Sequence, residues 1–244
     1  MADDLELRRA DGTDGSNPGR RSVLVGLAVS GTLAGAFTLV VVTDPQLLLG
    51  FDETVSRLTR DWADSWGWPV DLAHQVALKT GVVWSSFVAG LFAVFLLLRR
   101  RWAASFFLML SAFIGGLIGG CMKFLVSRDR PPGAERFEED LTDSFPSGHT
   151  MVGIYLYLAA GLVMLRIGQA NDRRWLVWLG WGFIVFGPLL GVTRLIVGAH
   201  WATDVIGGWA YGSAVVFGCA LLFWEPLDRG WLTWRKRVER PTAP

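Results

Sequence analysis

Six long stretches of the chain contain no Asp, Glu, Lys or Arg, and this feature constrains the fold most strongly. They cover residues 22–43, 80–98, 102–122, 144–165, 175–193 and 205–224. A helix that crosses a bilayer needs about 20 mostly apolar residues, and helices buried in soluble proteins seldom reach this length six times over. Only 18% of residues are charged, against about 25% in soluble domains. We therefore predict an all-α, polytopic membrane protein with six transmembrane helices rather than a soluble helical core.

The distribution of positive charge predicts how these helices are oriented. With the N-terminus inside, 15 of the 23 Lys and Arg residues fall in inner segments and 8 fall outside, as the preference of cytoplasmic loops for Lys and Arg requires. We predict a multi-pass plasma membrane protein with both termini cytoplasmic. Its parts are a flexible tail (1–21), a six-helix membrane domain (22–226) and a basic tail (227–244). Arg20-Arg21 before an apolar run resembles a twin-arginine export signal, but the run is long, which favours a retained helix.

A short amphipathic segment lies between the first two predicted spans. At helical spacing, one face carries the apolar residues Phe51, Val55, Leu58, Trp62 and Trp66, and the other carries Asp52, Glu53, Arg57 and Asp61. This pattern predicts a helix lying in the outer membrane interface. Its simplest role is anchoring, and the alternative is that it forms part of an entrance for a lipid.

Some features of the sequence have structural interpretations. The third predicted span carries Gly115, Gly116, Gly119 and Gly120, two overlapping G-x-x-x-G pairs that favour close helix packing. Cys121 and Cys219 lie in apolar runs without metal-ligand spacing, so we expect small core residues and neither a disulfide framework nor a zinc site. A net charge of +1 does not indicate a nucleic-acid partner.

Three polar clusters interrupt the apolar chain, and the predicted topology places all of them on the outer side. The first runs from Lys123 to Pro132, at the end of the third span. Lys123 and Arg130 are seven residues apart and share a face while the helix lasts, which Pro131 should end. Alone, this cluster is more typical of charges that snorkel at a membrane boundary.

The second cluster, residues 145–150, comes immediately before the fourth span. Ser147 is placed to cap that helix, and Gly148 lets a ligand approach the backbone. Uncapped N–H groups and the positive end of the helix dipole bind anions, and His149 would stand in the first turn beside such an anion. By itself, this pattern also fits an N-cap with an interfacial histidine.

The third cluster, residues 193–204, lies where the fifth span ends and the sixth begins. His200 and Asp204 are four residues apart and share a face on a helix. The carboxylate can accept a hydrogen bond from one ring nitrogen, which leaves the other free as a nucleophile. A purely structural His–Asp pair explains this cluster equally well when it is taken alone.

Taken together, the three clusters indicate phosphoryl chemistry. Lys123, Arg130 and Arg194 supply cations that neutralise phosphate oxygens. One histidine can attack phosphorus while the other protonates the leaving oxygen. A carboxylate cluster suited to Mg²⁺ does not accompany them, because Asp204 is committed to His200. We therefore expect a mechanism without a metal or another cofactor.

These residues resemble the signature of the type-2 phosphatidate phosphatase superfamily of integral-membrane lipid phosphate phosphatases. The signature is K-x6-R-P, P-S-G-H and S-R-x5-H-x3-D, which this chain shows at residues 123–131, 146–149 and 193–204 in that order. The one departure is Thr193, which stands where the family has serine. A hydroxyl is retained there, so phosphate contact at this position remains plausible.

The resemblance implies a metal-free phosphohistidine mechanism. It implies that His200 is the nucleophile, that Asp204 orients it, and that His149 is the general acid. The residues that correspond to the phosphate-binding set are Lys123, Arg130, Ser147, Gly148 and Arg194. Arg128 lies outside the pattern, and we expect it to sit in solvent rather than to steer a headgroup.

The expected activity is hydrolysis of a lipid phosphomonoester or diphosphate on the outer leaflet, with isoprenoid diphosphate or phosphatidylglycerophosphate favoured. Two alternatives stay open: a phosphotransferase that uses the same phosphohistidine, and a non-catalytic lipid-phosphate transporter. A soluble haloperoxidase, which shares a similar site, is disfavoured by the six apolar spans. The lipid tail and the oligomeric state are not indicated by any residue pattern.

Overall fold

The computed structural model describes residues 18–136 and 143–223, and this part of the chain contains helices and no strand. In chain order the elements are α2 (Pro18–Thr43), α3 (Gln46–Trp66), α4 (Trp68–Lys79), α5 (Val82–Leu98), α6 (Trp102–Leu125), η1 (Ala134–Arg136), α7 (Gly148–Val152), η2 (Gly153–Leu158), α8 (Ala159–Ala170), α9 (Arg174–Ile196) and α10 (Ala202–Leu222). The all-helical prediction is confirmed. Most of both predicted tails lies outside the described residues, although α2 already begins at Pro18.

Among the described residues, five helices are long and apolar enough to cross a membrane: α2, α6, the continuous helix Gly148–Ala170, α9 and α10. A sixth span exists if α4 and α5 count as one, but these two helices are bent by 51° at the break between them. The predicted second span, 80–98, therefore corresponds to α5 alone, which begins at Val82. The number of spans beyond five depends on how this bent pair sits in the membrane.

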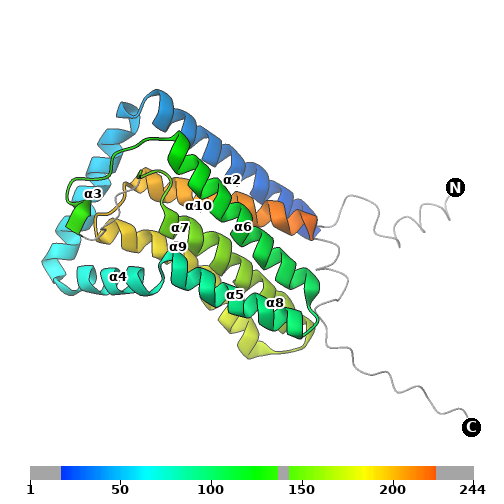
Figure 1. The fold of residues 1–244 in the computed structure, drawn as a ribbon. Helices are drawn as coiled ribbons and strands as arrows, with labels where there is room; N and C mark the ends of the chain where they lie inside the picture. The colour runs from blue at the N-terminus through cyan, green and yellow to red at the C-terminus, as the bar shows by residue number, and fades with distance from the viewer. Residues whose placement is uncertain (1–17, 137–142, 224–244) are drawn as a thin grey trace, which may run out of the picture.

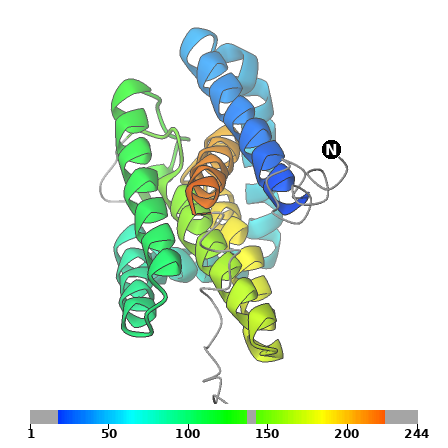
Figure 2. The ribbon, with the colours of Figure 1, turned by 90° about the vertical axis from the view of Figure 1, so that its right-hand side faces the viewer.

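The Gly148–Ala170 helix, made of α7, η2 and α8, forms the centre of the bundle (Figures 1 and 2). In this helix, 78% of the residues in the most apolar stretch are buried, against 17% in α2 and 22% in α9. It packs closely on α9 because glycines face each other: a Cβ on Gly153 would lie 2.3 Å from the Gly187 carbonyl oxygen. Only residues without a side chain allow two helix backbones to approach this closely.

The glycine pairs of α6 divide into two groups. Added Cβ atoms on Gly115 and Gly119 would meet Tyr155 and Met151 of the central helix, whereas those on Gly116 and Gly120 would meet none of the described atoms within 4 Å. Half of the predicted packing interface is therefore used within the chain. The expectation that both cysteines are core residues is wrong for Cys121, which is exposed on the outward face of α6.

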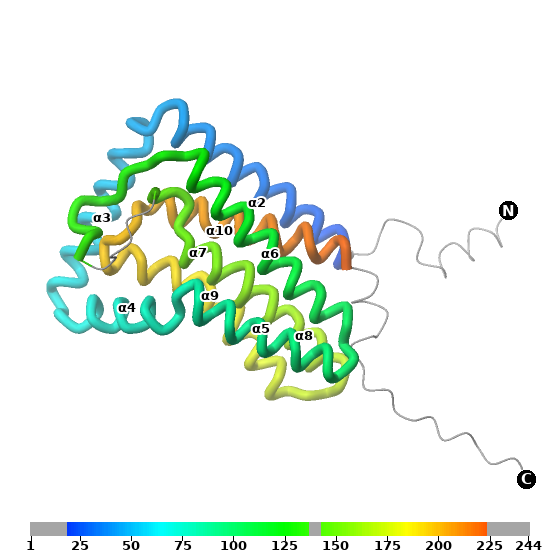
Figure 3. The backbone as a smooth tube through the Cα atoms, in the orientation of Figure 1, coloured from blue at the N-terminus to red at the C-terminus, as the bar shows by residue number. Residues whose placement is uncertain are grey.

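One end of the bundle gathers all the segments that carry the polar clusters. There, α6 and α9 end, α7 and α10 begin, and α3 lies across the ends of α9 and α10 (Figures 1 and 3). The first turn of α2 and the last turn of α10 lie at the opposite end. The alternating direction of the spans thus brings segments far apart in sequence to one place.

Helix α3 is amphipathic as predicted, but its polar face is split. The exposed apolar residues include Phe51, Leu58, Trp62 and Trp66, while Asp52 is fully buried against the bundle. The prediction that Asp52 shares one polar face with Glu53, Arg57 and Asp61 is therefore wrong, because those three residues are exposed. Helical spacing separates polar from apolar positions, but it does not show which polar side chain is turned inward.

Candidate active site

His200 lies in the short turn between α9 and α10. Gly198 adopts a positive φ of 69°, a conformation that suits glycine, and this lets the chain reverse just after α9. The turn places His200 inside the bundle end, where it is 2% exposed. His200 itself precedes α10, so it does not share a helix with Asp204 as the spacing suggested.

The two ring nitrogens of His200 face different partners. Nδ1 lies 3.5 Å from Oδ2 of Asp204 and 3.4 Å from Oγ of Ser144. Nε2 lies 3.3 Å from Nη1 of Arg130, which also donates to the Ala199 carbonyl oxygen at 3.0 Å. The structure therefore brings the predicted His–Asp pair together, with the second ring nitrogen beside a cation.

The environment of His200 favours its neutral form. Burial lowers the pKa of the imidazole below its ordinary value, and this effect outweighs the opposing influence of Asp204. The nearby cations Arg130 and Arg194 lower the pKa further. A neutral imidazole is the form that can act as a nucleophile.

The Asp204 carboxylate is held by several groups besides His200. Its Oδ2 accepts a hydrogen bond from the Trp201 backbone N–H at 2.9 Å and a very short one from the Ser144 hydroxyl. Its Oδ1 accepts one from Nη1 of Arg128 at 2.6 Å. The expectation that Arg128 sits in solvent is therefore wrong, because its side chain is 9% exposed and contacts a buried carboxylate.

Four residues around this carboxylate were not predicted as site residues: Asp52, Arg128, Ser144 and Thr203. Arg128 offered one signal, since it lies only two residues before Arg130 in a short polar loop. Asp52 offered none, because it contacts Thr203 across 151 residues of sequence. Its place in the site follows only from how α3 crosses the bundle.

The three predicted phosphate-binding cations come from different elements at this end. Lys123, in the last turn of α6, donates through Nζ to the Asp143 carbonyl oxygen at 2.8 Å. Its Cε lies 3.9 Å from where a Cβ on Gly148 would be, so it lies close to the start of α7. Arg194, in the last turn of α9, is buried.

The start of α7 is tied directly to the start of α10. The Ser147 backbone N–H donates to the Asp204 carbonyl oxygen at 3.1 Å. Ser147 holds the N-cap position, but its hydroxyl bonds to the Thr150 hydroxyl at 2.9 Å, and among the described residues it caps no backbone N–H. The predicted side-chain cap is therefore wrong, while the position at the helix start is right.

His149 lies on the side of the site that faces the bend between α4 and α5. A Cβ on Gly81, the residue before α5, would lie 3.7 Å from Nε2 of His149. The structure thus places this histidine next to the break between α4 and α5. Thr193 is already engaged, because its hydroxyl donates to the Leu190 carbonyl oxygen at 2.7 Å.

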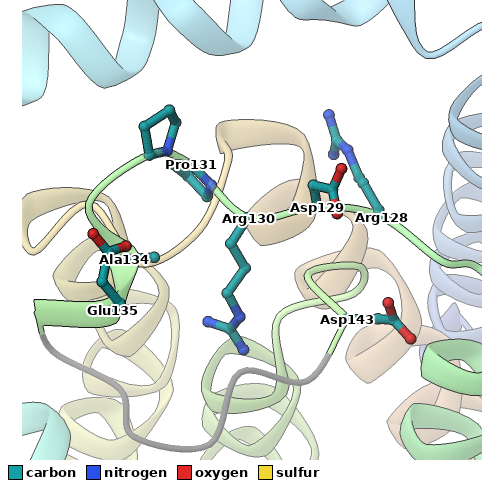
Figure 4. Close-up of a pocket in the computed structure, with 8 residues that line it drawn as sticks. Arg128, Asp129, Arg130, Pro131, Ala134, Glu135 and Asp143 are labelled. Atoms are coloured by element: carbon teal, nitrogen blue, oxygen red, sulfur yellow. The ribbon is translucent and has the colours of Figure 1, made fainter.

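A pocket of about 310 Å³ opens beside Arg130. It is lined by Arg128, Asp129, Arg130, Pro131, Pro132, Ala134, Glu135 and Asp143 (Figure 4). Figure 4 shows that the Arg128 and Arg130 side chains leave the loop in opposite directions. Because Arg130 lines the pocket and also lies beside His200, the pocket adjoins the predicted phosphate-binding cations.

Within the described ranges 18–136 and 143–223, no group of three or more His, Cys, Asp or Glu side chains is arranged to hold a metal ion. The cations near His200, Arg130 and Arg194, have no lone pair to offer a metal. The expectation of a reaction without metal or cofactor stays a prediction.

Comparison with a solved structure supports the fold. The chain matches the crystal structure of a transmembrane PAP2-type phosphatidylglycerolphosphate phosphatase from Bacillus subtilis with a TM-score of 0.54, 20% identity, and coverage of 89% of this chain and 98% of that one. At this level of identity the match establishes a shared fold of membrane helices. The protein is accordingly a multi-pass membrane protein.

Several curated proteins are similar to this chain in sequence. They include an undecaprenyl-diphosphatase of Sulfolobus acidocaldarius, 30% identical over 51% of this chain and 58% of its own length. A lipid A 1-phosphatase of Rhizobium johnstonii is 34% identical over 51% and 52%, respectively. Phosphatidylglycerophosphatase B of Bacillus subtilis is 31% identical over 49% and 57%. The chain thus spans little more than half the length of these curated relatives.

A family model matches more of the chain than the three clusters cover. The model of the PAP2 superfamily matches residues 102–227, just over half of the chain. The matched region starts at α6 and contains every residue of the three clusters, which the structure brings to one end of the bundle. This chain therefore belongs to the PAP2 superfamily.

Proposed function

We propose that this protein is a membrane lipid phosphatase that hydrolyses a lipid phosphomonoester or diphosphate through a phosphohistidine, without a metal ion. The observation that carries the proposal is the setting of His200. The ring is buried and its pKa is lowered, with Asp204 at Nδ1 and Arg130 3.3 Å from Nε2. A nucleophile next to a cation is what attack on an anionic phosphate requires.

In the first step, the Nε2 lone pair of His200 forms a bond to phosphorus. The bond between phosphorus and the leaving oxygen breaks, and that oxygen keeps the electron pair and takes a proton from His149. Asp204 accepts the Nδ1–H hydrogen bond and stabilises the positive charge that develops on the ring. Lys123, Arg130 and Arg194 neutralise the phosphoryl oxygens, with the Ser147 side chain and the backbone at Gly148 adding hydrogen bonds.

In the second step, water attacks the phosphohistidine. A bond forms between the water oxygen and phosphorus, the bond from phosphorus to Nε2 breaks, and His149 takes the proton from water. Inorganic phosphate leaves, and both histidines return to their starting states. An alcohol in place of water would give phosphoryl transfer by the same chemistry.

The location of the site favours a substrate that stays in the membrane. The site lies at one end of the bundle, at the depth where helices leave the apolar layer and lipid headgroups lie. The charge distribution supports an extracytoplasmic site with both termini cytoplasmic. The exposed apolar face of α3 supports its placement in the outer interface, beside the path of a lipid.

The candidate substrates are headgroups with a terminal phosphoryl group. The names of the similar proteins refer to undecaprenyl diphosphate, lipid A and phosphatidylglycerophosphate. Of these classes we favour an isoprenoid diphosphate or phosphatidylglycerophosphate for this chain. Side-by-side turnover of the two lipids in mixed micelles would identify the better one by kcat/KM.

The test is phosphate release by purified protein in detergent, with EDTA present. We expect the wild type to release phosphate and His200→Ala to lose the activity. His74→Ala is the matched control, since His74 lies on α4 and belongs to none of the three polar clusters, and it should keep wild-type turnover. Rapid quench of a labelled substrate in alkaline denaturant should trap a phosphoprotein in the wild type, whose label is lost on acid treatment, and none in His200→Ala.

Four results would contradict the proposal. Full activity of His200→Ala would show that His200 is not the nucleophile. Loss of activity in EDTA, restored by added metal, would show that the reaction requires a metal ion. Label that appears in an added alcohol but never in inorganic phosphate would make the protein a transferase. Tight lipid-phosphate binding without turnover would make it a binding protein or a transporter.

A further inference from the structure

Arg128 joins two buried carboxylates that come from distant parts of the chain. Its Nη2 lies 2.6 Å from Oδ2 of Asp52, and its Nη1 lies 2.6 Å from Oδ1 of Asp204. Both carboxylates are fully buried, and the Arg128 side chain is 9% exposed. Two buried negative charges this near to each other need a shared cation, and the planar fork of arginine suits such bridging.

Asp52 also holds the first turn of α10. Its Oδ1 accepts a hydrogen bond from the Thr203 backbone N–H at 2.9 Å, and its Oδ2 accepts one from the Thr203 hydroxyl at 2.7 Å. The same hydroxyl accepts from Nη1 of Arg128 at 2.7 Å. Helix α3 is thereby fastened to the residue that directly precedes Asp204.

These contacts restrict how the Asp204 carboxylate can turn. Its Oδ1 is held by Arg128, and its Oδ2 is held by Ser144 and by the Trp201 backbone N–H. The second oxygen is also the one that faces Nδ1 of His200, at 3.5 Å. Without the contact at Oδ1, the carboxylate would be held through Oδ2 alone, so its angle to the His200 ring would be less restricted.

The geometry assigns Arg128 and Asp52 as positioning residues that hold Asp204 in register with His200. This assignment rests on the proposed function, in which His200 attacks phosphorus and Asp204 orients it. Neither residue touches the reacting atoms, and both act through the carboxylate. The two residues also make α3, the amphipathic helix across the bundle end, a structural part of the active site.

Direct phosphate binding by Arg128 is the main rival explanation. The terminal nitrogens of Arg128 already donate to Asp52, Thr203 and Asp204. The guanidinium also lies 6.0 Å from the centre of the Trp201 ring, which flanks it. Its side chain points away from Arg130, the cation beside His200 (Figure 4). The contacts of Arg128 therefore favour a supporting role over a phosphate ligand.

The decisive variant is Asp52→Asn, which keeps the size of the side chain but removes its charge and one acceptor. Asp61→Asn is the matched control, because it makes the same change on the exposed side of α3. Arg128→Lys and Arg128→Gln complete the set. Each variant is assayed for kcat and KM with phosphatidylglycerophosphate in mixed micelles and for competitive inhibition by inorganic phosphate, and rates are normalised to folded protein from size-exclusion profiles.

We expect Asp52→Asn to lower kcat by roughly 10- to 100-fold, as loss of an outer-shell partner or misplacement of a reacting group does. KM and the inhibition constant of phosphate should stay within about twofold of wild type, because the cations that bind phosphate are intact. Arg128→Lys should retain more activity than Arg128→Gln, since a lysine keeps the charge but not the fork. Asp61→Asn should match the wild type.

Two results would overturn the assignment. Equal kcat for Asp52→Asn and Asp61→Asn, with both variants folded, would show that the bridge does not position Asp204. A rise in the phosphate inhibition constant of the Arg128 variants as large as the loss of kcat would make Arg128 a phosphate ligand. Should Arg128→Gln fail to fold, Asp52→Asn decides alone. A wild type without turnover would instead refute the proposed function, so the two failures are distinguishable.

Discussion

The contact between Gly153 and Gly187 offers a direct test of whether helix spacing sets the geometry of the site. A Cβ added in Gly187→Ala would lie 2.2 Å from the Gly153 carbonyl oxygen and 3.2 Å from the Cβ of Tyr157. Carbon atoms approach carbonyl oxygens to about 3.3 Å even in favourable contacts. The added methyl group must therefore push α9 and η2 apart by about 1 Å.

The expected magnitude follows from where the two glycines lie. Overpacking of this kind costs about 1–3 kcal/mol of folding free energy, which corresponds to a fall in Tm of about 2–12 °C for a chain of this length. Gly153 follows His149 by one helical turn, and Gly187 precedes Arg194 by two. A displacement of about 1 Å between a general acid and a phosphate-binding cation can lower the rate by about 100-fold.

The assay combines thermal unfolding in detergent with kcat/KM for the lipid substrate. Gly182→Ala is the matched control, since it lies on the same helix and its added Cβ would meet none of the described atoms within 4 Å. It should leave activity unchanged and raise helix stability by up to about 1 kcal/mol. If Gly187→Ala matches Gly182→Ala in both Tm and kcat/KM, the close backbone contact does not set the site.

Two further predictions concern His200 and His149. Because the pKa of His200 is lowered, its neutral form persists below the ordinary pKa of about 6.5, so the acidic limb of kcat/KM should lie below that pH. Arg130→Gln removes a cation that lowers the pKa of His200, so it should move the acidic limb to higher pH. The substrate ionises in the same way in both profiles and does not contribute to the difference. An acidic limb that stays in place would contradict the prediction. Gly81→Leu places a side chain next to Nε2 of His149 and should lower kcat for the lipid by about tenfold or more without changing inhibition by inorganic phosphate. Gly90→Leu, on the open side of α5, is the control. Equal rates for the two variants would show that the lipid leaving group does not occupy the space beside Gly81.

Several features of this protein could be predicted from sequence because they depend on composition along the chain. Uncharged stretches as long as the bilayer is thick leave helices as the main way to satisfy the backbone, and the described part of the chain contains five such helices. Spans of alternating direction bring every second helix end to the same side, which is why the clusters around Lys123, His149 and His200 could be expected to meet. The family resemblance rested on these same clusters, and the match over residues 102–227 confirms it.

Other features depend on how each helix is rotated and where each loop passes, and only the tertiary structure decided them. Asp52 was placed on the polar face of an interfacial helix and Arg128 in solvent, yet they form a buried bridge to Asp204. The bend between α4 and α5, the burial of the Gly148–Ala170 helix and the bond between Ser147 and Thr150 likewise had no signal in the pattern. Hydropathy and spacing show which side chains can reach the bundle end, since these are properties of single helices. Which charge pairs with which depends on contacts between elements up to 151 residues apart, and those contacts exist only once the helices have packed.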